Sequence, residues 1–183
     1  MKQAKCVVLG VTGSIAAFKA AEIASVLVRA GACVHVVMTR EAEEFVTPLT
    51  MQTLSRNKVY RGMFDMPERW DVEHVSLADE ADLVLVAPAT ANVIGRLASG
   101  ICDDFLSCIV MATKAPVLLA PAMNDGMYRH PITQENIAKL KKIGYAFIGP
   151  REGRLACGRD GVGRMCEPQE IVAEALRLLN KKR

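Results

Sequence analysis

Two short apolar runs that lead into Ala-Pro-Ala constrain the fold of this chain more than any other feature. The runs cover residues 83–87 and 117–120. Such short, wholly apolar stretches are typical of strands covered on both faces, as in a parallel sheet. Because proline cannot donate a hydrogen bond to a neighbouring strand, we expect the first strand to stop at Pro88. The turns that follow, which reach Asn92 and Asn124, should lie side by side at the carboxyl edge of the sheet, where open α/β folds bind ligands.

Strand and helix patterns alternate along the rest of the chain, which predicts a single three-layer α/β/α domain over residues 1–183. Its sheet should be doubly wound and mostly parallel, of the Rossmann or flavodoxin-like type. Ile15 and Phe18 are expected on the buried side of the first helix, and Asp103 at the start of a later one. Further strands are predicted at residues 6–10, 33–39 and 145–148, and helices at residues 15–30, 103–114, 131–143 and 168–180.

A glycine-containing turn, Gly10-x-x-Gly13, joins the first predicted strand to the first helix. This arrangement offers backbone N–H groups and the positive end of a helix to a phosphate. The spacing is not the full G-x-G-x-x-G, so it does not indicate a dinucleotide, and it lacks the Lys-Ser/Thr of a P-loop. A helix start that binds nothing is the alternative interpretation. Thr39 ends the second strand at the same edge of the sheet.

Five glycines fall within residues 149–165. We expect them to prevent regular structure and to leave a long loop, and long loops in compact domains often serve as lids. Residues 124–128 are expected to form a turn. His74 precedes another short turn, and a lone histidine in such a place is more often structural than catalytic.

Composition and charge argue against several functional classes. The net charge of +3, from 23 basic and 20 acidic residues, is too balanced to favour nucleic acid. The six cysteines form no C-x-x-C pair, so no metal site is expected. The absence of a signal peptide and of any membrane-spanning apolar run favours a cytoplasmic protein. Slightly positive mean hydropathy favours apolar surface hidden in an oligomer.

Five motifs occur in the order that is found in one known family. Together they resemble the homo-oligomeric flavin-containing cysteine decarboxylases, and the resemblance covers essentially the whole chain. The motifs are Gly13-Ser14-Ile15-Ala16, His74, Pro88-Ala89-Thr90-Ala91-Asn92, Pro121-Ala122-Met123-Asn124-x-x-Met127 and Ala156-Cys157-Gly158-x-x-Gly161-x-Gly163-Arg164-Met165.

This resemblance implies FMN as the cofactor. The sequence departs from the family pattern at Val93, where the family often has Thr, at Thr90, where it often has Ser, and at Tyr128, where it usually has Trp. Thr90 keeps a hydroxyl and Tyr128 keeps a flat amphipathic ring, so these departures affect fine geometry. By resemblance, the phosphate end would be held by Gly13, Ser14, Ile15 and Thr39, and the ring system by Thr90, Ala91, Asn92 and Ala122.

The likeness is closest to the members that convert 4′-phosphopantothenoylcysteine into 4′-phosphopantetheine in coenzyme A synthesis. Oxidation of the substrate's CH2–SH group to a thioaldehyde creates the electron sink that loss of CO2 needs, and the ene-thiol product is then reduced, so the net reaction is redox-neutral. His74 would act in the oxidative step, as a base or as a group that orients the carboxylate. Asn124 would hold the carboxylate, and Cys157 would donate the final proton. The same segment would bring further residues to the substrate: Ala156, Gly158, Arg164 and Met165.

The family also implies an assembly and partners. Its members form trimers, in some cases four trimers in a dodecamer, with the flavin at the subunit boundary. In many bacteria the domain is fused to the phosphopantothenoylcysteine synthetase that supplies its substrate, so a fused or separate synthetase is an implied partner. Three alternatives stay open: a peptidyl-cysteine decarboxylase of the same family, a flavin prenyltransferase of related fold, and a non-catalytic flavoprotein that binds a partner protein.

Overall fold

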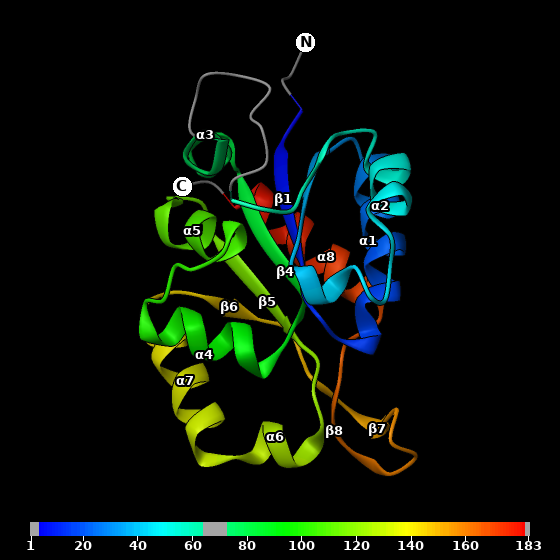
Figure 1. Cartoon of the computed structure of the whole chain (residues 1–183), viewed down its shortest axis with the longest axis vertical. Helices are drawn as coiled ribbons and strands as arrows, with labels where there is room; N and C mark the ends of the chain where they lie inside the picture. Colours follow the sequence, from blue (N-terminus) through cyan, green and yellow to red (C-terminus); the bar gives the residue numbers. More distant parts are fainter. Residues whose placement is uncertain (1–3, 64–72, 182–183) are drawn as a thin grey trace.

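The computed structural model describes residues 4–63 and 73–181 of the chain. Within them, six parallel strands form one sheet in the order β3-β2-β1-β4-β5-β6 (Figure 1). The order reverses between β1 and β4, which confirms the predicted doubly wound α/β/α fold and places a topological switch point at the carboxyl ends of these two strands. The strands are β1 (Cys6–Val11), β2 (Cys33–Met38), β3 (Val59–Tyr60), β4 (Leu83–Ala89), β5 (Val117–Pro121) and β6 (Ala146–Phe147).

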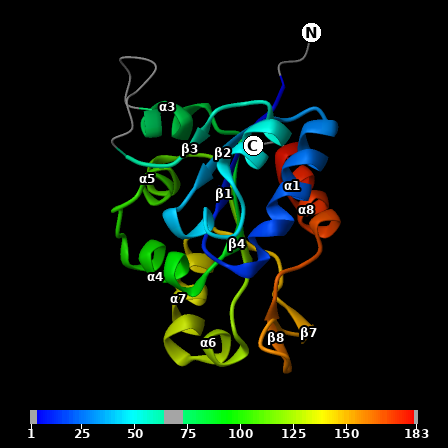
Figure 2. The same ribbon diagram turned by 45° about the vertical axis from the view of Figure 1, so that its right-hand side comes forward.

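Helices cover both faces of the sheet, and the two views in Figures 1 and 2 agree on the layers. One face carries α1 (Phe18–Arg29), α2 (Pro48–Ser55) and α8 (Pro168–Asn180). The other carries α3 (Glu73–Glu80), α4 (Ala91–Ser99), α5 (Phe105–Ala112) and α7 (Pro131–Lys142). Two 3-10 turns, η1 (Ile15–Ala17) and η2 (Arg40–Ala42), and the short α6 (Asp125–Arg129) lie at or beyond the strand ends. None of the helices in the described part of the chain combines the length and apolarity that crossing a membrane requires.

The apolar run of β4 separates the two cores of the domain. Leu83, Leu85 and Ala87 pack into the core under α1 and α8, whereas Val84 and Val86 pack into the core under α4 and α5. All seven residues of β4 are buried. Because side chains alternate between the faces of a strand, a sheet covered on both sides needs an uninterrupted apolar run. This is the reason that the sequence pattern predicted the central strand.

The prediction that β4 stops at Pro88 is wrong, since the strand continues to Ala89. The pairing of β4 with β5 shifts register between Val86 and Ala89, so Pro88 falls where the ladder does not require its missing N–H. The carbonyl oxygen of Pro88 instead accepts a 2.8 Å hydrogen bond from the Thr12 hydroxyl.

Several predicted turns are helical or capped differently. Thr90 caps the start of α4. Asp104 rather than Asp103 caps α5, because Asp104 exchanges hydrogen bonds with Ser107. Residues 125–129 form α6 instead of a turn, and residues 73–80 form α3, which includes His74.

The glycine-rich segment is a two-stranded antiparallel hairpin and not an irregular loop. Its strands are β7 (Arg151–Arg154) and β8 (Asp160–Arg164). Gly163 adopts φ 155°, and a Cβ at this position would lie 2.0 Å from the carbonyl oxygen of Met123. Glycine therefore lets the hairpin dock against the end of β5, where the Met123 N–H donates to the Gly163 carbonyl at 3.0 Å.

Candidate active site

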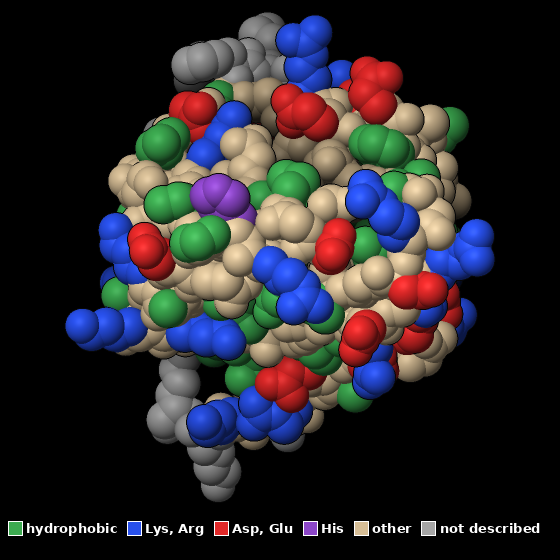
Figure 3. Space-filling view, turned by 90° about the horizontal axis from the view of Figure 1, so that it is seen from below, with side chains coloured by type: hydrophobic (Ala, Val, Ile, Leu, Met, Phe, Trp, Pro, Cys, Tyr) green, Lys and Arg blue, Asp and Glu red, His purple; other side chains and the backbone are tan. Residues whose placement is uncertain are grey.

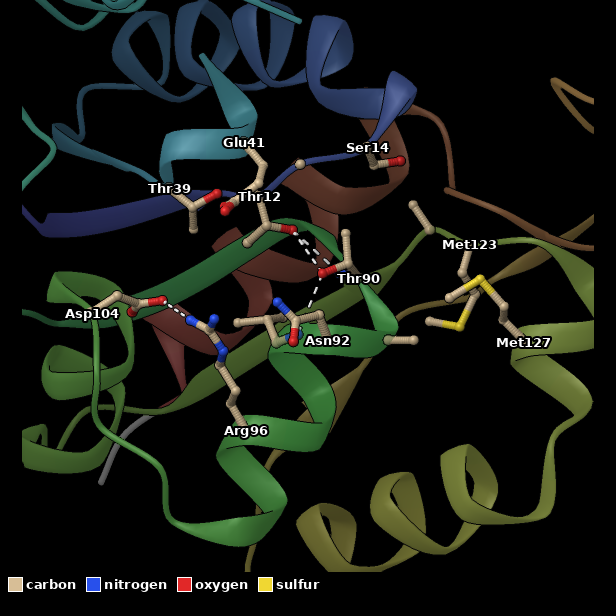
Figure 4. A pocket seen from close by; sticks show the side chains of 14 residues that line it. Thr12, Ser14, Thr39, Glu41, Thr90, Asn92, Arg96, Asp104, Met123 and Met127 are labelled. Carbon is tan, nitrogen blue, oxygen red and sulfur yellow. Dashed lines mark hydrogen bonds and ion pairs between the residues drawn. The ribbon is translucent and has the colours of Figure 1, made fainter. Parts of the chain in front are cut away.

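A crevice of about 290 Å³ opens at the carboxyl ends of β1, β2, β4 and β5 (Figure 4). This is the switch point at which α/β folds bind ligands. The turns after β4 and β5 form neighbouring walls, as the two Ala-Pro-Ala runs predicted. Seven of the eight residues assigned to the cofactor line this crevice: Gly13, Ser14, Thr39, Thr90, Ala91, Asn92 and Ala122.

Hydrogen bonds from Thr12 fix the geometry of the crevice floor. The Thr12 hydroxyl donates to the Pro88 carbonyl, and the Thr90 N–H donates to the Thr12 oxygen at 3.3 Å. The end of β1 is thereby tied to the end of β4. Sequence reasoning missed Thr12, although its place between Gly10 and Gly13 was a usable signal.

The crevice wall contains a buried polar atom, the hydroxyl oxygen of Thr39. The Thr39 hydroxyl oxygen is buried and has no hydrogen-bond partner among the described residues. Figure 4 shows Thr39 beside Thr12 at the crevice wall. Leaving such an atom unsatisfied costs free energy, which a ligand with hydroxyl or phosphate oxygens would recover. Nearby, a Cβ on Gly13 would lie 2.4 Å from Cβ of Glu41, so only glycine allows the turn to run this close to the crevice wall. These features fit the FMN that the family resemblance implies.

Charged side chains that sequence reasoning did not assign close one end of the crevice. Nη1 of Arg96 lies 2.6 Å from Oδ2 of Asp104 and 3.1 Å from Oδ1 of Asp103. Glu41 lines the same crevice. Figure 4 shows the Arg96–Asp104 pair on one side of the view and Met123 and Met127 on the other. The crevice thus has a polar end and a thioether-lined end.

A second cavity of about 480 Å³, which we call the hairpin pocket, adjoins the crevice. The two share Ser14, Ala122 and Met123. The hairpin supplies one wall and the start of α1 supplies another. The hairpin pocket is lined by Ser14, Ile15, Ala16, Phe18, Lys19, Ala122, Met123, Asn124, Arg154, Leu155, Ala156, Cys157, Gly163, Arg164 and Met165.

Asn124 and Cys157 meet in the hairpin pocket. Nδ2 of Asn124 lies 3.8 Å from Sγ of Cys157. Oδ1 of Asn124 accepts a 2.9 Å hydrogen bond from the Gly126 N–H, which turns the amide NH2 group toward the thiol. The backbone N–H of Arg159 and then its guanidinium lower the pKa of the exposed Cys157 thiol, against the effect of partial desolvation. A hydrogen-bond donor and a thiol with a lowered pKa therefore lie side by side in the hairpin pocket.

Two predicted site residues lie differently from what the sequence suggested. Ile15 lines the hairpin pocket and not the crevice that contains Thr39. Ile15 and Phe18 are 56% and 59% exposed, so the prediction that they are buried is wrong. They precede the part of α1 that faces the sheet, where Ile23 and Leu27 are buried. Gly158 forms the hairpin turn, with φ 81° and its N–H donating to Leu155, and lies outside the pocket lining.

His74 lies apart from Cys157 within one chain. It belongs to α3, and its ring packs edge-on against Phe105 at 6.0 Å between centroids. His74 lines neither the crevice nor the hairpin pocket. Figures 1 and 2 both place α3 and the β7–β8 hairpin at opposite ends of the molecule. Phe105 borders a third cavity, which shares Thr39, Glu41, Arg96 and Asp104 with the crevice. His74 therefore packs against a wall residue of the cavity that adjoins the polar end of the crevice.

The end of the molecule that carries the hairpin shows mixed charge. Figure 3 views this end from below, with basic and acidic side chains interspersed among apolar ones. Such a surface differs from the clustered basic face that nucleic-acid binding requires.

Known proteins with similar sequences are flavoproteins and proteins of coenzyme A biosynthesis. A family described as Flavoprotein matches residues 1–180. The coenzyme A biosynthesis bifunctional protein CoaBC of Bacillus subtilis is 53% identical over 166 residues, which are 91% of this chain and 41% of that protein. The chain therefore spans about two fifths of the length of such bifunctional relatives. A probable phosphopantothenoylcysteine decarboxylase of Streptococcus mutans is 44% identical over 170 residues, which are 92% of this chain and 95% of that protein.

Solved structures with the same fold include flavoproteins. A PPC decarboxylase mutant in complex with pantothenoylaminoethenethiol superposes with a TM-score of 0.85 at 30% identity, over 98% of this chain and 100% of that chain. The FMN binding protein AtHal3 superposes with a TM-score of 0.85 at 30% identity, over 99% of this chain and 100% of that one.

Proposed function

Because the chain belongs to the Flavoprotein family, we propose that it is the FMN-dependent decarboxylase of 4′-phosphopantothenoylcysteine, which makes 4′-phosphopantetheine for coenzyme A. The observation that carries this proposal is the meeting of Asn124 and Cys157 beside the crevice, whose Thr39 hydroxyl has no hydrogen-bond partner among the described residues. A thiol substrate in the hairpin pocket would lie next to a flavin in the crevice. The sequence similarity to a probable phosphopantothenoylcysteine decarboxylase and to a bifunctional protein of coenzyme A biosynthesis supports the assignment.

The proposed cofactor site is the crevice. Gly13, Ser14 and Thr39 would hold the phosphate and ribityl end, and Thr90, Ala91, Asn92 and Ala122 would line the ring system. Ile15 follows this turn in the chain, but it lines the hairpin pocket. We therefore assign Ile15 to the substrate side of the site and not to the cofactor. When bound, FMN would accept and return the hydride that makes decarboxylation of an ordinary cysteine possible.

The protein's own groups would orient the substrate and move protons. The NH2 group of Asn124 would hold the substrate carboxylate without a full positive charge, so departure of neutral CO2 loses little stabilisation. Cys157 would donate a proton to carbon in the final step, and the Arg159 N–H would stabilise the thiolate left behind. Ala156, Arg164 and Met165 would complete the wall over the substrate.

His74 would reach the reacting cysteine from a neighbouring subunit. This assignment is supported by its distance from Cys157 in the fold and its packing against Phe105, a wall residue of the cavity that adjoins the polar end of the crevice. It requires the homotrimer, alone or as part of a dodecamer, with the flavin at the subunit boundary. His74→Asn and Cys157→Ser proteins, each inactive alone in making the final product, should regain activity when mixed and reassembled. Failure of co-assembled variants to regain any activity would contradict the shared site.

We assign residues 1–183 to one FMN-binding decarboxylase domain that works in the cytoplasm, fused to or beside the synthetase that supplies its substrate. The bifunctional relatives support that partner class.

The proposal is tested by the products that two variants form from 4′-phosphopantothenoylcysteine. The Cys157→Ser variant should still release CO2 and accumulate the oxidised ene-thiol, whereas the His74→Asn variant should release none. Mass spectrometry distinguishes the two products. Normal product from Cys157→Ser at the wild-type rate would show that the proton-donor role is wrong, and release of CO2 only from a peptide with a C-terminal cysteine would favour the peptidyl-cysteine alternative.

A further inference from the structure

The charged side chains that line the hairpin pocket are positive, and the roles proposed for Asn124 and Cys157 do not explain them. Its lining contains three charged side chains, and all three are cations: Lys19, Arg154 and Arg164. No Asp or Glu lines it in the described residues. The adjoining crevice, in contrast, carries Glu41 and Asp104. The hairpin pocket therefore suits a ligand with an anionic group in addition to the reacting cysteine.

Two of these cations converge on one carboxylate. Nζ of Lys19 lies 2.9 Å from Oε2 of Glu167, and the guanidinium of Arg164 binds Oε1 of the same residue. The Lys19 side chain is only 13% exposed, so its stem is packed and its ammonium group is positioned rather than freely mobile. An ammonium group has three N–H donors, and one bond to Glu167 leaves donor capacity for a further anion.

Lys19 and Arg164 lie near the base of the hairpin, and Cys157 lies beyond its other end. Arg164 pairs with Arg151 at the base, and Asp160 pairs with Arg154 next to the turn that holds Cys157. The four residue-to-residue steps from Asp160 to Arg164 span roughly 13 Å of strand. In 4′-phosphopantothenoylcysteine, about eleven bonds separate the phosphorus from the cysteine Cα, which is roughly four peptide units or 13 Å when extended.

Apolar side chains line the hairpin pocket along with the cations and Cys157. Ile15, Phe18, Leu155 and Met165 all contribute to it. Ile15 and Phe18 are both exposed in the isolated chain, so their side chains are available to a ligand in this pocket. The substrate's arm carries a dimethyl-substituted carbon and methylene groups, whose burial against these residues would be favourable.

We propose that Lys19, together with Arg164, binds the terminal phosphate of the substrate and so determines specificity for phosphorylated over unphosphorylated thiols. This inference rests on the proposed function, because it takes 4′-phosphopantothenoylcysteine as the substrate. Lys19 and Arg164 are positioned for the remote end of that molecule, while Asn124 and Cys157 act on the cysteine end. Glu167 competes with the phosphate for the same two cations.

The test compares phosphorylated and unphosphorylated ligands on the FMN-loaded protein. In Lys19→Met, which keeps the apolar stem, KM for 4′-phosphopantothenoylcysteine should rise roughly 10- to 100-fold with little change in kcat, and KM for pantothenoylcysteine should not change. Glu167→Gln should act in the opposite direction and lower KM for the phosphorylated substrate alone. Lys5→Met is the matched control, because it also breaks a lysine–carboxylate pair (Nζ of Lys5 to Oδ1 of Asp82, 2.7 Å) but lies at the amino ends of β1 and β4, opposite the two cavities.

Calorimetry with 4′-phosphopantothenate and pantothenate gives a readout that does not depend on decarboxylation. The wild type should bind the phosphorylated compound more tightly, and Lys19→Met should lose that difference. Equal binding of both compounds by the wild type, equal weakening of both by Lys19→Met, or loss of FMN from this variant would overturn the inference. If the wild type prefers the phosphorylated compound but releases no CO2 from 4′-phosphopantothenoylcysteine, the proposed function fails while the phosphate subsite stands.

Discussion

The amide nitrogen of Asn124 lies 3.8 Å from the sulfur of Cys157, across 33 positions of sequence. The end of β5 delivers the amide, and the turn of the β7–β8 hairpin delivers the thiol. Docking of Gly163 on Met123 holds the two segments together. The group proposed to hold the carboxylate and the group proposed to donate the proton are thus adjacent before substrate binds, which reduces the ordering that catalysis requires.

Asn124→Asp should weaken substrate binding and slow the reaction. The carboxylate would keep the side chain's size but repel the substrate carboxylate and raise the pKa of Cys157. We expect kcat/KM to fall at least about tenfold, because a hydrogen bond to a charged group is replaced by repulsion. Steady-state CO2 release measures this, with Asn180→Asp at the exposed end of α8 as control. Unchanged kcat/KM in Asn124→Asp would show that Asn124 does not hold the substrate carboxylate.

Thr39→Val should lower FMN affinity without destabilising the flavin-free protein. The change preserves shape and removes a buried hydroxyl that has no partner in the described residues. FMN dissociation constants from fluorescence titration should rise roughly threefold to tenfold, while the Tm of the flavin-free protein stays level or rises. Thr53→Val, at an exposed position of α2, should leave FMN affinity unchanged. A lower Tm with unchanged FMN affinity would mean that the Thr39 hydroxyl serves the fold alone.

Gly163→Ala should uncouple the hairpin from the crevice. The added Cβ would fall 2.0 Å from the Met123 carbonyl oxygen, so the hairpin cannot keep its position. We expect decarboxylation to fall more than about tenfold while FMN affinity changes little. Gly31→Ala is the matched control, since Gly31 also has a positive φ of 88° but has open space around it. It should lower the free energy of unfolding by about 1 kcal/mol and leave activity intact. Full activity in Gly163→Ala would refute the docking role.

The final proton transfer should depend on pH through Cys157. Arg159 lowers the pKa of this thiol, and a proton donor must be protonated, so product formation should decline as pH rises through that lowered pKa. Arg159→Gln removes the guanidinium and keeps the backbone N–H, so the alkaline limb of the profile should move to higher pH by part of the shift. Rapid-quench measurement of ene-thiol reduction follows this step. A limb that stays in place would assign the titration to another group.

Most of the fold could be predicted from the sequence, because a parallel sheet that is covered on both faces requires local apolar runs. Residues 83–87 and 117–120 therefore predicted β4, β5 and the crevice at their ends, and Gly10-x-x-Gly13 predicted the turn beside it. Proline and glycine rules misled where tertiary contacts decide the outcome. Pro88 stays in β4 because the register shifts around it, and Gly163 permits a docked hairpin because Met123 leaves no room for a side chain.

The site residues that sequence reasoning missed depend on long-range contacts. Thr12 matters through the Pro88 carbonyl, 76 positions away, and Lys19 through Glu167, 148 positions away. The Gly10-x-x-Gly13 turn marks the neighbourhood of Thr12, but no local pattern marks the distant partner of either residue. The position of His74 within α3, apart from Cys157, likewise follows from packing against Phe105 and not from motif order.

The most direct test of the central claim is the fate of 4′-phosphopantothenoylcysteine on the purified, FMN-loaded protein. With oxygen excluded and no added oxidant or reductant, mass spectrometry should show repeated turnover to 4′-phosphopantetheine with one CO2 released per molecule. Tight FMN binding without any loss of CO2, or failure of the assembled protein to hold FMN, would contradict the account.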